Sequence, residues 1–186
     1  IERYSRNIIL QEIGGKGQEK LLKAKVFCIG AGGLGCPVLQ YLAAAGVGTL
    51  GIVDDDVVAL NNLHRQVLYS VADIGASKAQ TAARVLSGLN PEINIIAHNT
   101  RLSTDNALGL MNAFDIIVDG TDNFATRYLV NDSCVLLNKP FIYGALHEFE
   151  GQVSVLNFQD GPTYRCLFPG NAELDNIPNC NDNGIL

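Results

Sequence analysis

Apolar and polar positions along the chain follow two periodicities, that of short buried strands and that of helices. Short apolar runs bounded by turn residues predict buried strands, and longer segments with apolar residues at helical spacing predict helices between them. Strands and helices alternate, which favours an α/β fold with a mostly parallel sheet. The predicted parallel strands cover residues 26–29, 49–53, 93–97, 114–118 and 140–145, and an antiparallel strand covers 151–158. The predicted helices cover residues 36–45, 73–89, 104–112 and 125–137.

Residues 25–56 have the layout of a dinucleotide-binding βαβ unit: strand, glycine-rich turn, helix, strand, acid. In the GAGGLG turn, Gly30 allows a tight bend, Gly32 lets backbone N–H groups approach a phosphate, and Gly35 lets the helix pack close to the strand. The N-terminus of that helix offers N–H donors and a partial positive charge to an anion. Asp54, at the end of the second strand, can accept hydrogen bonds from ribose hydroxyls. The segment therefore predicts a nucleotide site without specifying the nucleotide; the alternative is a turn that only packs a helix on a sheet.

Polar residues follow the second strand and open the next predicted helix. Asn62 and Arg65 lie in a loop at the carboxyl edge of the sheet, where open α/β sheets bind ligands. Arg65 could reach phosphates held by the glycine turn, although a plain surface loop would look the same. Lys78 falls early in a predicted helix, where a cation is unfavourable against the helix dipole. A nearby anion would explain that position, and a solvated Lys is the alternative.

The fourth predicted strand runs into the sequence DGTDN, residues 119–123, directly before a helix. An acid at this place suits Mg²⁺ when a phosphate is present, because Mg²⁺ takes one or two carboxylates together with phosphate oxygens. Asp and Asn are also common helix N-caps. Both roles can be filled here, one by each of the neighbours Asp122 and Asn123.

Composition excludes several classes of protein. The chain has 186 residues, 47% of them hydrophobic and 17% charged, which is ordinary for one soluble α/β domain. The net charge of −6 argues against a general nucleic-acid binder, which would carry a basic face. No apolar run is long enough to span a bilayer and no signal-peptide pattern opens the chain, so we expect a cytoplasmic protein without a membrane partner.

Five cysteines sit mostly in apolar segments, and their odd number suits a reducing compartment. We expect Cys28, Cys36 and Cys134 to be small core residues. The chain has no CxxC pair, so a zinc site built from this chain alone is not expected.

The candidate residues together favour a triphosphate over a dinucleotide. A nicotinamide-dependent oxidoreductase would use the glycines and Asp54 but has no evident use for Arg65, Lys78 and Asp122 together. No GxxxxGK[ST] sequence is present, so the nucleotide would be bound without a P-loop. With the β and γ phosphates neutralised, pyrophosphate becomes a good leaving group, and a carboxylate attacking the α-phosphate would give an acyl adenylate. Such catalysis rests on positioning and electrostatics rather than on a protein nucleophile.

Seven motifs in order carry a resemblance to a known family. They are RYSRNIIL, GAGGLGCPV, LNNLHRQ, GASKA, DGTDN, EGQVSV and GPTYRCLFP, and the similarity runs from Arg3 to the last residue. The sequence resembles the ThiF/MoeB/HesA family of adenylyltransferases, relatives of ubiquitin-activating enzymes, which activate ubiquitin-like sulfur-carrier proteins of the ThiS or MoaD kind. The resemblance implies a Rossmann-like, mixed but mostly parallel sheet with helices on both faces and a C-terminal crossover loop.

The resemblance also assigns roles to residues. Gly33 would lie under the ATP phosphates beside Gly30, Gly32 and Gly35, and Asp54 would bind the ribose. Asn62, Arg65 and Lys78 would contact the triphosphate, Asp122 would hold Mg²⁺, and Asn123 would lie next to the nucleotide.

Residues 1–24 predict an amphipathic helix and then a turn at Gly14-Gly15, and by themselves favour a solvated helix face for Arg6. The resemblance instead matches Arg6 to an arginine that reaches into the partner subunit's site, which implies a homodimer. It implies a substrate similar to a small β-grasp protein ending in Gly-Gly.

The C-terminal segment departs from the family pattern. Residues 161–186 predict a long loop that crosses the carboxyl edge of the sheet. Thr163 stands where the first cysteine of a CxxC pair would be, leaving only Cys166, so structural zinc is doubtful. Cys180 matches a crossover-loop cysteine that can link covalently to the carrier. Residues 1–186 would form one ATP-binding adenylation domain, with its last strands and helix beyond Leu186.

Two alternatives to adenylation stay open at the level of sequence. A non-catalytic scaffold would dock a β-grasp protein without activating it. A nicotinamide-dependent oxidoreductase rests only on the glycine turn and Asp54.

Overall fold

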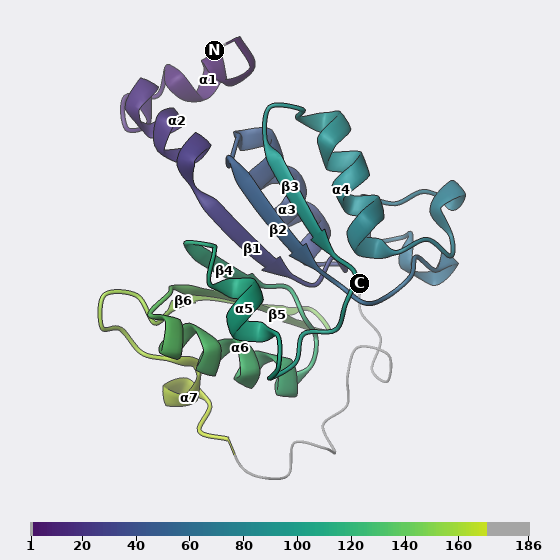
Figure 1. Cartoon of the computed structure of the whole chain (residues 1–186), viewed down its shortest axis with the longest axis vertical. Helices are drawn as coiled ribbons and strands as arrows, with labels where there is room; N and C mark the ends of the chain where they lie inside the picture. Colours follow the sequence, from purple (N-terminus) through teal and green to yellow (C-terminus); the bar gives the residue numbers. More distant parts are fainter. Residues whose placement is uncertain (1, 171–186) are drawn as a thin grey trace.

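A six-stranded sheet organises the protein in the computed structural model, which describes residues 2–170 (Figure 1). The strand order is β3-β2-β1-β4-β5-β6; neighbouring strands pair in parallel except β5 and β6, which pair antiparallel. The predicted mixed, mostly parallel sheet is confirmed. The strands are β1 (Lys25–Ile29), β2 (Thr49–Val53), β3 (Asn94–His98), β4 (Ile116–Asp119), β5 (Phe141–His147) and β6 (Glu150–Leu156).

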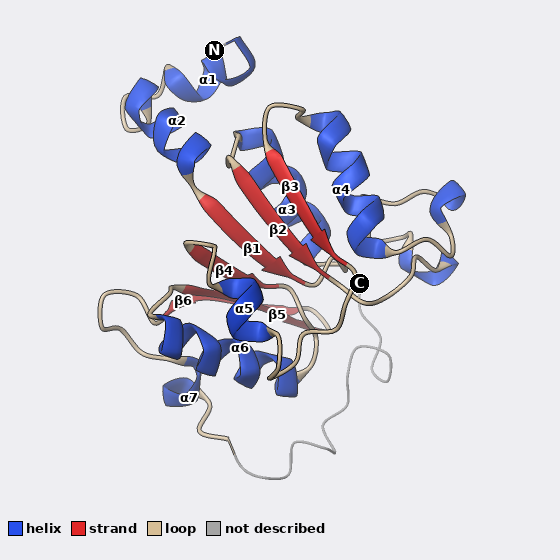
Figure 2. Cartoon of the chain, in the orientation of Figure 1, coloured by secondary structure: helices blue, strands red, loops and turns tan. Residues whose placement is uncertain are grey.

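Helices cover both faces of this sheet, as predicted (Figure 2). Helices α3 and α4 pack on one face, and α5 and α6 on the other. The helices are α1 (Ser5–Ile8), α2 (Gly14–Lys23), α3 (Gly35–Ala45), α4 (Lys78–Leu89), α5 (Ala107–Met111), α6 (Phe124–Leu137) and α7 (Tyr164–Leu167), with 3₁₀ turns η1 (Glu2–Tyr4), η2 (Leu60–Asn62) and η3 (Val71–Asp73).

Strand β1 shows why the central strands are continuous apolar runs. Val26 and Cys28 pack into the core under α3 and α4, whereas Phe27 and Ile29 pack into the core under α5 and α6. A parallel strand that is covered on both faces has no polar side, so alternation disappears from its sequence.

Several boundaries differ from the sequence predictions. Gly14-Gly15 is not a turn that ends a helix: Gly14 has a φ of +55° and begins α2. Helix α4 begins at Lys78 rather than at residue 73, because the Ser77 hydroxyl caps it by accepting from the Gln80 N–H. Strand β4 begins two residues later than predicted, and α5 is shorter at both ends. Periodicity marks the middle of an element, whereas capping groups set its ends.

The predicted C-terminal loop contains the short helix α7, and residues 171–186 lie outside the described residues. Three cysteines are core residues as predicted, since Cys28, Cys36 and Cys134 are fully buried. Between residues 2 and 170, no helix has both the length and the apolar composition needed to cross a bilayer.

The order of the strands sets where a ligand can bind. Strands β2 and β4 flank β1 on opposite sides. The chain therefore adds β2 and β3 on one side of β1 and then crosses over to add β4 on the other side. Ligands of open α/β sheets bind at the carboxyl ends of the strands at such a switch point. There the Gly30 N–H donates to Val53 O at 2.9 Å and the Gly120 N–H donates to Ile29 O at 2.8 Å, which joins the turns after β1 and β4.

Candidate active site

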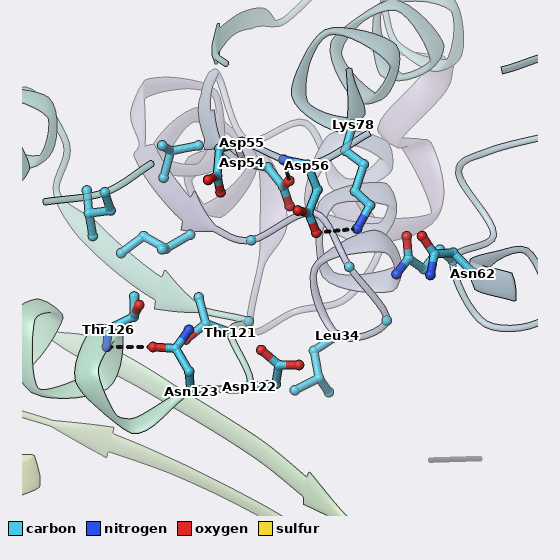
Figure 3. A pocket seen from close by; sticks show the side chains of 18 of the residues that line it. Leu34, Asp54, Asp55, Asp56, Asn62, Lys78, Thr121, Asp122, Asn123 and Thr126 are labelled. Atoms are coloured by element: carbon cyan, nitrogen blue, oxygen red, sulfur yellow. Dashed lines mark hydrogen bonds and ion pairs between the residues drawn. The ribbon is translucent and has the colours of Figure 1, made fainter. Parts of the chain in front are cut away.

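A polar pocket of about 580 Å³ opens at the carboxyl ends of β1, β2 and β4 (Figure 3). It brings together nearly all the predicted binding residues, which come from five separate segments of the chain. The predicted residues that line it are Gly30, Gly32, Gly33, Asp54, Asn62, Arg65, Lys78, Asp122 and Asn123.

The glycine turn forms the floor of the pocket. Gly30 has a φ of +88°, and a Cβ there would meet the Gly120 carbonyl oxygen at 3.1 Å. Gly35 does not line the pocket; it lets α3 start against the turn, since a Cβ at Gly35 would lie 2.0 Å from Gly30 O. The backbone N–H groups of Gly33 and Leu34 have no acceptor within residues 2–170. The start of α3 therefore leaves donors available to an anion.

Asp54 is held rigidly at the end of β2. Its Oδ2 accepts from the Ala31 N–H at 2.8 Å and its Oδ1 accepts from the Asp56 N–H at 2.9 Å. Burial raises the pKa of Asp54, and these two hydrogen bonds oppose the rise. Each carboxylate oxygen has a further lone pair, so Asp54 can still accept hydrogen bonds from a diol such as that of a ribose.

Lys78 has a protein anion beside it, which the sequence analysis did not identify. Its Nζ lies 2.9 Å from Asp56 Oδ2, and its side chain is only 7% exposed, against 69% for Asp56. The Lys78 N–H also donates to Asp56 O at 3.0 Å. The buried Tyr69 hydroxyl shares its one hydrogen between Ala31 O at 2.7 Å and Lys78 O at 3.3 Å, which links the start of α4 to the glycine turn. The run of three acids after β2 was the signal for this pairing.

The segment 60–66 covers the glycine turn. Arg65 packs beside Gly33, because a Cβ at Gly33 would lie 3.4 Å from Arg65 Cδ, and Arg65 Nη1 donates to Asn61 O at 3.2 Å. The sequence analysis did not single out Gln66 as a site residue. Its side chain is 3% exposed, lines the pocket, and has a buried Oε1 without a partner in the described part of the chain.

Asp122 and Asn123 divide the two roles predicted for them. Asn123 is the N-cap of α6, since its Oδ1 accepts from the Thr126 N–H at 2.8 Å. Asp122 is exposed, and its carboxylate makes no hydrogen bond within residues 2–170. It lies on the opposite side of the pocket from Asp56 and Lys78 (Figure 3).

The free carboxylate of Asp122 offers an oxygen ligand of the kind that Mg²⁺ prefers. Within the described residues, no three or more His, Cys, Asp or Glu side chains gather to hold a metal. Mg²⁺ commonly binds through one or two carboxylates plus phosphate oxygens and waters, so a site of this kind needs a bound phosphate to complete it.

Asp119 and Arg127 form a buried charged cluster that the sequence analysis did not identify as part of the site. Asp119 is 2% exposed and Arg127 is 6% exposed. Burial raises the pKa of Asp119 to about 6, while the hydrogen bond from the Thr121 N–H and the charge of Arg127 oppose the rise. Charged side chains are rarely buried unless they are paired, and carboxyl groups with a strongly shifted pKa are concentrated at functional sites.

Arg6 is not brought into the pocket of its own chain. It is exposed on α1, which lies beyond the amino ends of the strands, away from the carboxyl edge (Figure 1). Cys180 lies outside the described residues. Cys166 is exposed, and its thiol lies 3.3 Å from the Thr163 hydroxyl. The prediction that this chain has no zinc site stays a prediction.

Comparison with known proteins supports the resemblance. Residues 4–186 match the ThiF family. "Adenylyltransferase and sulfurtransferase MOCS3" of Aedes aegypti is 51% identical over the whole chain, which covers 43% of that protein. "Sulfur carrier protein adenylyltransferase" of Thermus thermophilus is 49% identical, and the chain covers 70% of it. The crystal structure of E. coli MccB with MccA-N7isoASN has a TM-score of 0.81 and 32% identity, over 88% of this chain and 50% of that chain.

The chain spans less than half the length of several of the relatives it matches, 43% and 42% for two of them. Its match to the family model nevertheless runs from Tyr4 to the last residue, and the matched residues include every strand of the sheet and the whole pocket. The chain belongs to the ThiF family.

Proposed function

We propose that this protein is an ATP-dependent adenylyltransferase that activates the C-terminal Gly-Gly carboxylate of a ubiquitin-like sulfur-carrier protein. The carrier would be ThiS- or MoaD-like and would serve thiamine or molybdopterin biosynthesis. The observation that carries the proposal is the pocket, where backbone N–H groups that can bind a phosphate, cationic side chains that include Arg65 and Lys78, and the free carboxylate of Asp122 meet at the switch point. Two relatives, from Thermus thermophilus and Aedes aegypti, are named adenylyltransferases, which supports the proposal.

The pocket offers a matching group for each part of ATP. Asp54 would accept hydrogen bonds from the ribose hydroxyls, and the free N–H groups of the glycine turn would hold a phosphate. Arg65 and Lys78 would neutralise the phosphate charge, with Asn62 alongside. Asn123 already uses its Oδ1 as an N-cap, so only its Nδ2 is available to the nucleotide.

Asp122 would hold Mg²⁺ against the phosphates, where the ion would neutralise the charge that develops on the leaving pyrophosphate. No protein nucleophile is needed for the reaction. One oxygen of the carrier's terminal carboxylate would attack the α-phosphorus; the new bond is that carboxyl oxygen to phosphorus, and the bond from phosphorus to pyrophosphate breaks. Among the residues described, 2–170, those that line the pocket include no cysteine, serine or histidine. Catalysis would come from orientation and charge stabilisation.

The experiment that tests the reaction is ATP–pyrophosphate exchange with Mg²⁺ and Gly-Gly-ended carriers of the same genome, added one at a time. Exchange that depends on one carrier would support the proposal and identify the pathway. Exchange that ignores the carrier, or that persists in Asp122→Ala, would contradict it. Nucleotide and carrier binding without exchange would favour a docking scaffold, and tight NADH binding without ATP binding would favour an oxidoreductase.

We also propose a homodimer in which Arg6 completes the partner's site. The support is that Arg6 is exposed, as are Ile9 at 70% and Leu10 at 52%. Mixing inactive Arg6→Ala and inactive Asp122→Ala proteins tests this, because a mixed dimer would hold one site with both residues intact. With random pairing, half of the dimers are mixed and each holds one intact site of two, so about one quarter of the wild-type exchange should return. No recovery in a mixture shown to exchange subunits would contradict it.

Three further expectations belong to this proposal. Residues 1–186 would act as one adenylation domain. The buried thiols of Cys28, Cys36 and Cys134 suit a cytoplasmic location. Cys180 would form a covalent link to the carrier, its thiol attacking the acyl adenylate carbonyl carbon with AMP as the leaving group, and Cys180→Ser would abolish this link on a non-reducing gel.

A further inference from the structure

Two buried charged side chains hold the backbone of one residue in the loop between β4 and α6. The Thr121 N–H donates to Asp119 Oδ1 at 2.8 Å, and the Thr121 carbonyl oxygen accepts from Arg127 Nη2 at 3.1 Å. Asp119 ends β4 and Arg127 lies in the first turns of α6, so the strand and the helix each contribute one side of the contact.

Packing makes this arrangement rigid. The Arg127 guanidinium lies over the rings of Phe124 and Tyr143, at 5.2 Å and 5.4 Å from their centroids. Both Asp119 and Arg127 are almost fully buried, and Arg127 also borders the pocket, so neighbouring groups hold each side chain beside Thr121.

Stability alone does not explain these charges. No Asp119–Arg127 ion pair forms within 4.0 Å among the described residues, and Asp119 Oδ2, Thr121 Oγ1 and Arg127 Nε are buried without a partner there. Apolar side chains of similar volume would fill the same space without burying charge.

The other residues of the loop are fixed as well. The Gly120 N–H donates to Ile29 O at 2.8 Å, and Asn123 caps α6. The free group is the Asp122 carboxylate, which follows Thr121 directly and faces the pocket. The backbone direction at Thr121 therefore decides where that carboxylate lies.

We propose that Asp119 and Arg127 are positioning residues: by holding both backbone polar groups of Thr121, they fix the Asp122 carboxylate where Mg²⁺ and a nucleotide phosphate meet. This inference rests on the proposed function, because it needs a nucleotide in the pocket. It assigns to Asp119 and Arg127 a role in metal binding although neither would touch the metal. Groups that orient a metal ligand in this way commonly change metal affinity by about 10- to 100-fold when removed.

The test measures binding of a non-hydrolysable ATP analogue by calorimetry, with Mg²⁺ and with EDTA, in the absence of carrier. Asp119 does not line the pocket, so Asp119→Ala should lower the affinity measured with Mg²⁺ by about tenfold or more and change the affinity in EDTA by less than about twofold. Arg127 does line the pocket, so Arg127→Met should lower both affinities, with the larger loss in the presence of Mg²⁺. Asp119→Asn keeps an oxygen acceptor for the Thr121 N–H and should restore the response to Mg²⁺. In an Asp122→Ala background, Arg127→Met should have no further effect on that response.

Arg165→Met is the matched control. Arg165 also stacks on an aromatic ring, Tyr128 at 4.7 Å, and pairs with a carboxylate, Asp132 at 2.7 Å, but it does not line the pocket. Its substitution should leave both affinities unchanged. Amide hydrogen exchange of the apo protein adds a readout without ligand: Arg127→Met should accelerate exchange at 120–123 by about tenfold or more while β1 and β2 stay protected.

The outcomes separate this inference from the proposed function. An unchanged response to Mg²⁺ in both Arg127→Met and Asp119→Ala, or equal losses with Mg²⁺ and with EDTA, would overturn it. If Arg127→Met is unfolded, the comparison of Asp119→Ala with Asp119→Asn decides. A wild-type protein that binds no nucleotide would instead contradict the proposed function.

Discussion

A Cβ atom at Gly35 would lie 2.0 Å from the carbonyl oxygen of Gly30, which is far inside any tolerable contact. The first residue of α3 therefore rests directly on the turn after β1. At Gly32, in the same turn, a Cβ would meet nothing closer than the Gln66 side-chain nitrogen at 3.7 Å. Gly35 therefore allows α3 to pack against the turn, whereas Gly32 leaves space open in the pocket.

This difference predicts opposite phenotypes for two alanine substitutions. Gly35→Ala should destabilise the protein by about 3 kcal/mol or more, because the clash is with backbone. Gly32→Ala should change the free energy of unfolding by less than about 1 kcal/mol but lower ATP affinity by about tenfold or more, since a methyl group would stand where a phosphate approaches. Urea unfolding and calorimetric ATP titration check both. A strongly destabilised Gly32→Ala protein would show that Gly32 is structural.

Lys78→Met is expected to separate stability from activity. A buried ammonium whose partner is the largely exposed Asp56 recovers little of its desolvation cost, so methionine should leave stability unchanged or raise it by about 1 kcal/mol. Pyrophosphate exchange should fall by about 100-fold or more, because a charge facing the phosphates is lost. Lys23→Met removes an exposed lysine 2.6 Å from Glu19 and is the control, with no expected change in exchange. Marked destabilisation by Lys78→Met would assign Lys78 a structural role.

The neighbours Asp122 and Asn123 should respond differently to alanine. Asp122→Ala removes an exposed carboxylate without a hydrogen bond in the described structure, so unfolding should change by less than about 0.5 kcal/mol while the Mg²⁺-dependent part of ATP binding disappears. Asn123→Ala removes the N-cap of α6 and should cost about 1 kcal/mol. Thermal unfolding and nucleotide titration measure the two effects. The reverse pattern would mean that the roles assigned to these residues are exchanged.

Asp119 should make stability depend on pH. Its pKa of about 6 in the folded protein lies above its ordinary value of 3.8, chiefly because it is buried, so the folded state binds the proton more tightly. The stabilisation is complete below the ordinary pKa and is lost as pH rises through the folded pKa. The advantage in unfolding free energy of Asp119→Asn over wild type should therefore grow by about 2 kcal/mol from about pH 4 to pH 7. Urea unfolding in EDTA measures it, and a difference that stays constant with pH would contradict the assignment.

Secondary structure was predictable where periodicity was strong. The strand at 26–29, the helix after the glycine turn and the antiparallel strand after Gly151 all form as expected. The errors fall at ends, such as the start of α4 at Lys78, because a single capping hydroxyl at Ser77 decides that boundary.

The sequence by itself determined the glycine turn, the acid after β2 and the polar loops that follow β2 and β4, because these features are local and the carboxyl ends of parallel strands meet at one edge. Only the tertiary structure decided that Asp56 pairs with Lys78, that the Gln66 amide is buried, and that Asp119 and Arg127 hold Thr121. These contacts depend on which side chains lose access to water when the helices and loops pack against the sheet. Burial of that kind is a property of the packed strands and helices, and no residue pattern within one segment records it.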